Sequence, residues 1–151
     1  MGQYIYTILP DTDTIYNLER NNGLAVCSIM SATAKIAIGD EIFIYLGDNT
    51  NYRKNLSVVM SMCNRIAYRA TVVEIFGDNQ NLSGTYQNIE MYVSRLSEYA
   101  ADNLTLGKLI KFNQSFQPQQ NDILDLAELQ YNEILSYIKS ILVSKKIVSS
   151  V

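Results

Sequence analysis

Residues 66–76 read IAYRATVVEIF, and this stretch decides the class of fold. It is rich in β-branched and aromatic residues, which favour strands. It contains no glycine or proline and is followed by the turn-forming residues 77–79. In an extended chain, alternate side chains point to opposite faces, which here separates Ala67, Arg69, Thr71 and Val73 from Tyr68, Ala70, Val72 and Glu74. The stretch therefore predicts a strand that ends at residue 76.

Similar composition recurs on both sides of this strand. Residues 4–9, 42–46 and 86–96 are predicted strands, because each is apolar or aromatic and most are bounded by turn residues. The short apolar runs 24–30 and 56–62 are interpreted as strands or buried segments. The chain therefore supplies five or six short strands.

Helical spacing is clearest near the end of the chain. In residues 121–146, apolar side chains recur three or four positions apart, which is the period of a helix with one buried face. Residues 11–20 are a shorter helix candidate. We therefore predict one α+β domain over residues 1–151. Its expected core is a small curved mixed sheet or a β-barrel, flanked by helices and followed by a long C-terminal helix.

The charge of the chain is unevenly distributed. The net charge is −3, which argues against indiscriminate attraction to phosphate backbones. Residues 49–73, however, contain no acidic residue and carry four cations, which we treat as candidate phosphate contacts: Arg53, Lys54, Arg65 and Arg69. Such a run forms either a basic stripe for nucleic acid or an ordinary solvated face.

Several classes of chemistry are excluded by what the sequence lacks. There is no histidine, so Ser-His or Cys-His nucleophiles and histidine-bearing metal sites are ruled out. The glycines form no phosphate-binding loop. The two cysteines, Cys27 and Cys63, fit neither a disulfide framework nor a metal cluster, which indicates a reducing, cytoplasmic compartment. We expect no cofactor, no metal, no membrane segment and no enzymatic activity.

Aromatic residues are the chemistry that the sequence does offer. It has 11 Tyr and 4 Phe, and a tyrosine ring can both stack on a nucleic-acid base and form a hydrogen bond. Tyr4 and Tyr6 alternate with apolar residues in the first predicted strand, and Tyr45 ends a later one. These rings line either a base-binding pocket or the interior of a small sheet.

Three stretches of the chain resemble EVE domains of the PUA-like superfamily, which are related to YTH and ASCH domains. They are the first strand with its proline at residues 4–10, the segment KIAIGDEIFIY at residues 35–45, and the tail with SFQP at residues 115–118 before the last helix. The resemblance implies a PUA-like β-barrel flanked by helices. It also implies binding of DNA or RNA that carries a modified base, often flipped into an aromatic pocket, alone or within a defence or regulatory assembly.

The resemblance assigns pocket residues by motif position. It places Tyr4, Ser28 and Tyr45 in the pocket, with Gln117 as a further candidate, and Tyr6 joins them because it follows Tyr4 on the same face of the strand. Tyr4 stands where the family usually has tryptophan.

Two other functions remain open from the sequence. The apolar stripe of residues 121–146 is wider than one packed face needs, which suggests a non-catalytic protein-interaction module that forms a homo-oligomer or joins a larger assembly. The related ASCH group includes amide hydrolases that use Lys, Thr and Glu, and Lys35, Thr71 and Glu74 provide these residue types.

Overall fold

The computed structural model describes most of the chain. Backbone and side chains are described for residues 2–8, 17–19, 23–29, 36–47, 63–77, 86–119, 122–127 and 131–143. The backbone alone is described at residues 30, 78–81, 84–85 and 144–149.

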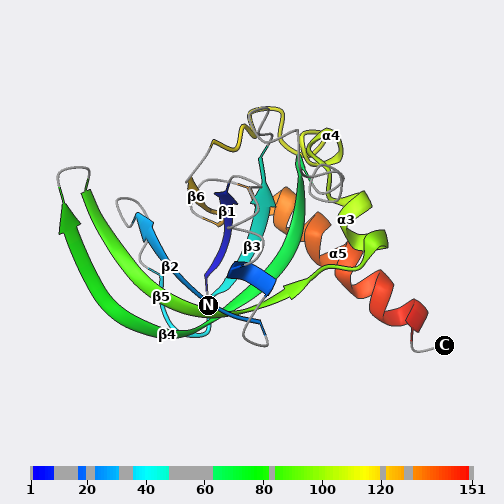
Figure 1. Ribbon diagram of the computed structural model, residues 1–151. Coiled ribbons are helices and arrows are strands. Elements are labelled where there is room, and N and C mark those ends of the chain that lie inside the picture. Colours follow the sequence, from blue (N-terminus) through cyan, green and yellow to red (C-terminus); the bar gives the residue numbers. More distant parts are fainter. Residues whose placement is uncertain are drawn as a thin grey trace, which may run out of the picture.

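Six strands form one mixed sheet. They are β1 (Gln3–Ile8), β2 (Leu24–Met30), β3 (Glu41–Leu46), β4 (Arg65–Asn81), β5 (Gly84–Arg95) and β6 (Ile123–Asp125). Their order across the sheet is β2-β5-β4-β3-β1-β6, with β1 and β3 parallel and the other described pairs antiparallel. The sheet is strongly curved (Figure 1). Its end strands β2 and β6 do not pair within the described residues, so the curved mixed sheet is confirmed and the described strands do not close into a barrel.

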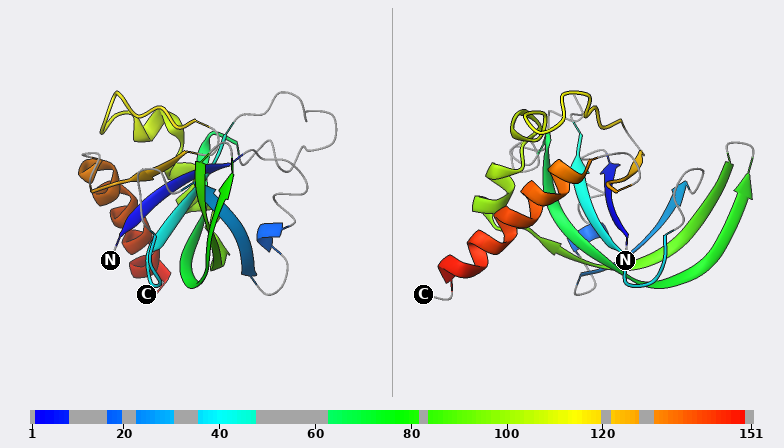
Figure 2. Two further views of the ribbon diagram at one scale, coloured as in Figure 1. Left: turned by 90° about the vertical axis from the view of Figure 1, so that its left-hand side faces the viewer. Right: turned by 180° about the vertical axis from the view of Figure 1, so that it is seen from behind.

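Three described helices lie outside the curve of the sheet (Figure 2): α3 (Glu98–Asn103), α4 (Leu106–Leu109) and α5 (Asn132–Ser149). The long α5 crosses the convex side, where Ile134 and Ile138 are fully buried. This position explains the apolar stripe of the C-terminal segment, because one face of α5 packs on the sheet while the other faces solvent.

The pleat of β1 and β3 separates two cores. Tyr4 pairs with Ile42, and Tyr6 with Ile44; these side chains belong to the core on the concave side. The intervening side chains of the two strands, Ile5, Phe43 and Tyr45, point to the convex side. There they pack against the helices and form the second core. Alternation along each strand therefore decides which core a tyrosine joins.

A tight corner fixes the start of β1 beside β3. The buried carboxylate of Asp40 accepts hydrogen bonds from the backbone N–H of Gly2 (2.9 Å) and of Ala37 (2.8 Å). Gly39, at φ 92°, adopts the left-handed conformation that the turn requires. The Gly-Asp pair, which contributes to the EVE resemblance, thus has a structural role in this chain.

The expected end of the central strand at residue 76 was wrong. β4 continues to Asn81, and its pairing with β5 shifts register between Val72 and Glu74 and again between Ile75 and Gly77. Gly77 has φ 123°, so it accommodates a bulge where a turn was predicted. The bulges allow β4 and β5 to bend as one long hairpin.

The expected helix over residues 121–146 was wrong at its start. Residues Ile123–Asp125 form β6, which pairs antiparallel with β1, and α5 begins at Asn132. Pairing with the exposed edge of β1 outweighs helical propensity for this short apolar run. The predicted strand at 56–62 lies outside the described residues, and of the helix candidate at 11–20 only residues 17–19 are described; these three are helical.

Candidate functional site

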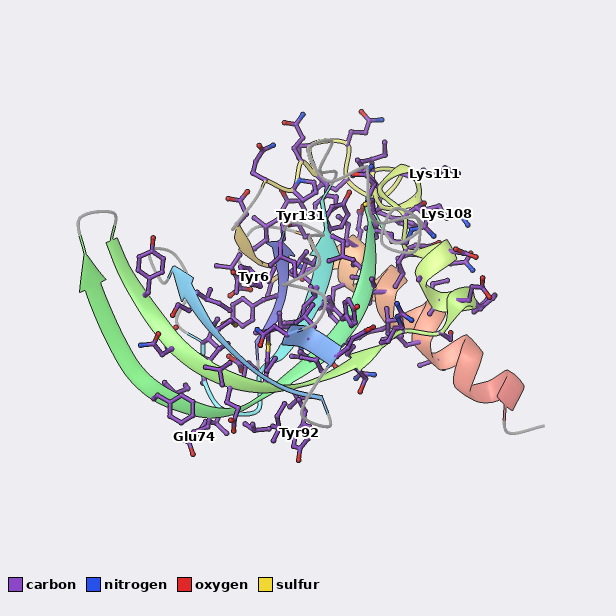
Figure 3. The ribbon with its side chains drawn as sticks, viewed as in Figure 1. Tyr6, Glu74, Tyr92, Lys108, Lys111 and Tyr131 are labelled. Atoms are coloured by element: carbon purple, nitrogen blue, oxygen red, sulfur yellow. The ribbon has the colours of Figure 1, made fainter. Side chains whose placement is uncertain are left out.

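The predicted pocket tyrosines of β1 lie on the concave side of the sheet. Tyr4 and Tyr6 are both buried in the concave-side core, and Figure 3 shows Tyr6 on the inner side of the curve. Burial, with a smaller contribution from Cys27 of β2, raises the pKa of Tyr6 to about 12. The Tyr6 hydroxyl is therefore protonated at neutral pH and the ring is part of the packing.

Tyr45 lies on the opposite side of the sheet. It is buried in the convex-side core, where its ring packs edge-on against Phe116, with the ring centroids 6.3 Å apart. Phe116 in turn packs edge-on against Tyr131, at 5.7 Å. This aromatic cluster joins β3 to the segment before α5.

The two polar candidates are exposed and lie apart from the tyrosines. Ser28 is on the convex side of β2, where its hydroxyl donates a hydrogen bond to the side-chain oxygen of Asn88 on β5. Gln117 lies in the connection between α4 and β6. The predicted pocket residues Tyr4, Tyr6, Ser28, Tyr45 and Gln117 are thus distributed over both faces of the sheet and a connecting segment, and the structure does not bring them together.

The two predicted phosphate contacts in the described part of the chain are paired with carboxylates. Arg65 contacts Asp102 of α3, with 2.6 Å between nitrogen and oxygen, and Arg69 forms an ion pair with Glu41 of β3. The other two, Arg53 and Lys54, lie outside the described residues.

The residue types of the hydrolase alternative are only partly described. The expected separation of Thr71 and Glu74 on opposite faces was wrong: the bulge between Val72 and Glu74 shifts the alternation, and both are exposed on the convex side of β4. A carboxylate oxygen of Glu74 accepts a hydrogen bond from the backbone N–H of Ile75, at 3.1 Å. Lys35 lies outside the described residues.

A different set of side chains gathers around the C-terminal end of α3, where Asn103 takes part in three hydrogen bonds and the carbonyl of the neighbouring Asp102 accepts a fourth. The Tyr137 hydroxyl of α5 donates to the Asn103 carbonyl at 2.8 Å, and the Asn103 side-chain amide donates to the carbonyl of Tyr99 at 2.8 Å. The Lys108 ammonium donates to the Asn103 side-chain oxygen and to the Asp102 carbonyl, each at 3.1 Å. These bonds hold α3, α4 and α5 in fixed relative positions.

Three aromatic rings surround this network. The rings of Phe112 and Tyr137 are stacked, with centroids 4.3 Å apart and an interplanar angle of 26°. Phe112 is 37% exposed and Tyr99 is 48% exposed, so both rings are accessible. The pKa of Tyr137 is raised mainly by partial burial and to a smaller extent by the neighbouring Tyr99. Its hydroxyl therefore remains a hydrogen-bond donor at neutral pH. We call Tyr99, Phe112 and Tyr137, with Lys108 and Lys111, the aromatic surface.

The aromatic surface carries two lysines, and one carboxylate, that of Glu133, lines the depression beside Phe112 and Tyr137. Asp102 is paired with Arg65, and within the described residues neither Lys108 nor Lys111 forms an ion pair with a carboxylate. Figure 3 shows both lysines on the α3–α4 flank of the molecule. Among the described residues, both ammonium groups thus keep an unpaired positive charge beside the rings on a chain whose net charge is negative, and Lys108 is held in place by its hydrogen bonds to Asp102 and Asn103.

A shallow depression continues the aromatic surface along α5. Its volume is about 450 Å³, and its lining combines the stacked rings with small polar side chains: Phe112, Asn132, Glu133, Ser136, Tyr137 and Ser140. An aromatic wall with nearby hydroxyl and amide groups suits a planar ligand that also carries hydrogen-bonding edges.

Sequence reasoning missed the aromatic surface because its members come from three separate elements. A local signal existed for α3: Ser97 accepts a hydrogen bond from the backbone N–H of Ala100 at 3.2 Å, and Glu98 follows it in the first turn. A serine followed by an acidic residue is typical of a helix start, and this would have placed Tyr99 on a helix.

Comparison with protein-family models, with curated proteins and with solved structures finds no match to this chain. Within the described residues, no group of three or more cysteine, aspartate or glutamate side chains is placed to hold a metal ion. Among the described helices, none has the length and apolar character needed to span a bilayer.

Proposed function

We propose that this chain is a nucleic-acid-binding module that uses the aromatic surface to hold an unstacked base of DNA or RNA. The observation that carries the proposal is the stacked and partly exposed pair of Phe112 and Tyr137, flanked by two lysines that have no carboxylate partner among the described residues. Exposed aromatic rings on which bases can stack, beside cations that contact phosphates, are a usual means of binding single-stranded nucleic acid.

Each part of the surface supports a different part of the ligand. An exposed ring face gains about 1–3 kcal/mol from each base that stacks on it. The ammonium groups of Lys108 and Lys111 would neutralise phosphates, and each phosphate neutralised on a single strand adds about −0.7 to the slope of log affinity against log salt. Because stacking needs a free base face, the preferred ligand is a single strand or a flipped base.

The resemblance to EVE domains supports the same ligand class and adds the expectation of a modified base. Methylation enlarges and polarises the face of a base without removing its stacking surface. A methylated base would therefore suit a site built from rings and small polar groups. The proposed role is binding, with no reaction at this surface.

Fluorescence anisotropy tests the proposal with matched single- and double-stranded oligonucleotides, with and without methylated bases, at two salt concentrations. We expect the single strands to bind more tightly, and affinity to fall as salt rises. Phe112→Leu, which keeps apolar volume but removes the ring face, should weaken binding by about tenfold or more. Lys111→Ala should weaken all oligonucleotides and flatten the salt dependence by one phosphate contact.

Lys139→Ala is the matched control, because it removes a lysine from α5 on a flank away from Phe112. It should leave affinity close to that of the unaltered protein. Absence of binding at low salt, or equal losses for Lys111→Ala and Lys139→Ala, would remove the aromatic surface as the site.

A further inference from the structure

The convex side of β2, β4 and β5 is a second surface, distinct from the aromatic surface. Its outward side chains form rows across the strands: Thr71 pairs with Tyr92, and Tyr92 with Leu24. Tyr92 is 53% exposed and Val26 is 51% exposed, and Figure 3 shows Tyr92 and Glu74 on the outer side of the curve. We call Leu24, Val26, Thr71, Glu74, Glu90 and Tyr92 the convex face.

The convex face carries an uncompensated pair of like charges. Glu74 of β4 lies directly opposite Glu90 of β5, and within the described residues neither carboxylate has an ion-pair partner. Like charges directly opposite each other destabilise a sheet. The two glutamates lie beside the exposed side chains of Tyr92 and Val26. Such a surface is complementary to a partner that carries cations and apolar side chains.

The C-terminal part of α5 is complementary to that face. Ile134, Ile138 and Ile141 form the buried face of α5, whereas Val143 lies on its opposite face and is 54% exposed. Lys139 has no carboxylate partner among the described residues, and the sequence after Glu133 contains three lysines and no acidic residue. Figures 1 and 2 show this end of α5 as the outermost part of the molecule on its side.

A groove joins the two regions within one chain. Its volume is about 740 Å³, and it is lined from the sheet by Gln3, Gly39, Glu41, Arg69 and Thr71 and from α5 by Lys139, Leu142 and Val143. Thr71 belongs to both the groove and the convex face, so the groove and the convex face form one continuous surface. Arg69 and Glu41 neutralise each other there, which leaves Lys139 as the unbalanced charge of the groove.

We propose that this continuous surface is covered by a second copy of the same chain, with the C-terminal part of α5 of each copy lying on the convex face of the other. A two-fold axis places the same patch on both copies, so each supplies one cationic helix end and one acidic face. Tyr92, Val26 and Val143 form the apolar centre, and the glutamates and Lys139 form the polar rim, as is usual for interfaces. The dimer is independent of nucleic-acid binding.

Sedimentation velocity over a range of concentrations tests the dimer. The unaltered chain should dimerise reversibly, and its dissociation constant should rise with salt because the rim is electrostatic. The double variant Glu74→Lys, Glu90→Lys and the single variant Lys139→Glu should each raise that constant by about tenfold or more. Combining all three changes restores opposite charges and should bring the constant back toward that of the unaltered chain.

The matched control is Lys111→Glu, the same charge reversal on the α4 flank, which should leave dimerisation unchanged and weaken oligonucleotide binding. Tyr92→Glu is a second disruptive variant that does not depend on the paired glutamates. Circular dichroism verifies that each variant is folded. A chain that stays monomeric throughout, or charge reversals that do not weaken the dimer, would overturn the proposal; so would a triple variant that is no better than the singles.

Discussion

The hydroxyl of Tyr137 on α5 donates a hydrogen bond to the backbone carbonyl of Asn103 over 2.8 Å, and so ties the longest of the described helices to the C-terminal end of α3. The same ring stacks on Phe112, at 4.3 Å. Tyr137 therefore combines two roles, which can be separated because the hydroxyl holds the helices together while the ring supports the exposed ring of Phe112.

Tyr137→Phe removes the hydrogen bond and keeps the ring. We expect the free energy of unfolding in urea to fall by about 1 kcal/mol, the usual contribution of one such bond, and oligonucleotide affinity to change little. Tyr137→Leu should lose affinity as well, because it removes the ring that stacks on Phe112. If the phenylalanine variant lost as much affinity as the leucine variant, the hydroxyl rather than the ring would be the binding group.

The sequence was a good guide to the strands whose local composition was sufficient to identify them. Runs of apolar, aromatic and β-branched residues predicted β1, β3 and the first part of β4; β1 and β3 are buried on both faces, where such continuous runs are typical of strands. Local signals failed where a distant partner decided the outcome. β6 forms because β1 offers a free edge, and residue 77 continues the strand because β5 pairs on past it.

The candidate site was less predictable for the same reason. Tyr99, Phe112 and Tyr137 have no common spacing in the sequence, and they meet only because α5 crosses α3 and α4. The arginines were selected on charge alone, and charge does not reveal that Arg65 and Arg69 have carboxylate partners from elements 28 or more positions away. Tertiary packing decides both the meeting of the three rings and the pairing of the arginines. The spacing of residues in a single sequence does not reveal such packing.

Gly77 should be intolerant of any side chain. Its φ of 123° lies in a region that only glycine occupies readily, and a Cβ there would meet nothing within 4 Å. Gly77→Ala should therefore lower the free energy of unfolding by about 1–3 kcal/mol through backbone strain alone.

Gly107 provides the matched control. It lies in α4, where a Cβ also meets nothing within 4 Å, so Gly107→Ala should raise stability by up to about 1 kcal/mol through helix propensity. Urea unfolding compares the two variants. Equal effects of the two substitutions would contradict the strained bulge.

Asp40 should be a structural residue of the corner between β1 and β3. Its carboxylate accepts one N–H with each oxygen, from Gly2 and from Ala37. Hydrogen bonds to a charged group contribute about 1.5–3 kcal/mol each, so Asp40→Ala should be strongly destabilising. Asp40→Asn should lose less, because the amide oxygen still accepts one bond. Thermal unfolding of the two variants orders them, and an asparagine variant as unstable as the alanine variant would contradict this account.

The concave-side core should make the protein sensitive to high pH. Burial raises the pKa of the Cys27 thiol from 9.0 to about 12, and burial, followed by Cys27, raises that of Tyr6 from 10.0 to about 12. Between about pH 9 and 12 the unfolded chain therefore releases protons that the folded chain retains, so the free energy of unfolding falls as pH rises. Each pKa unit corresponds to about 1.4 kcal/mol at most.

Urea unfolding at pH 8 and at pH values between about 9 and 11 measures the slope. Cys27→Val, which keeps an apolar side chain of similar size, should flatten it from its lower end, because the unfolded pKa of the Cys27 thiol, 9.0, is below that of Tyr6, 10.0. A variant with the slope of the unaltered protein would show that Cys27 is not the group that ionises.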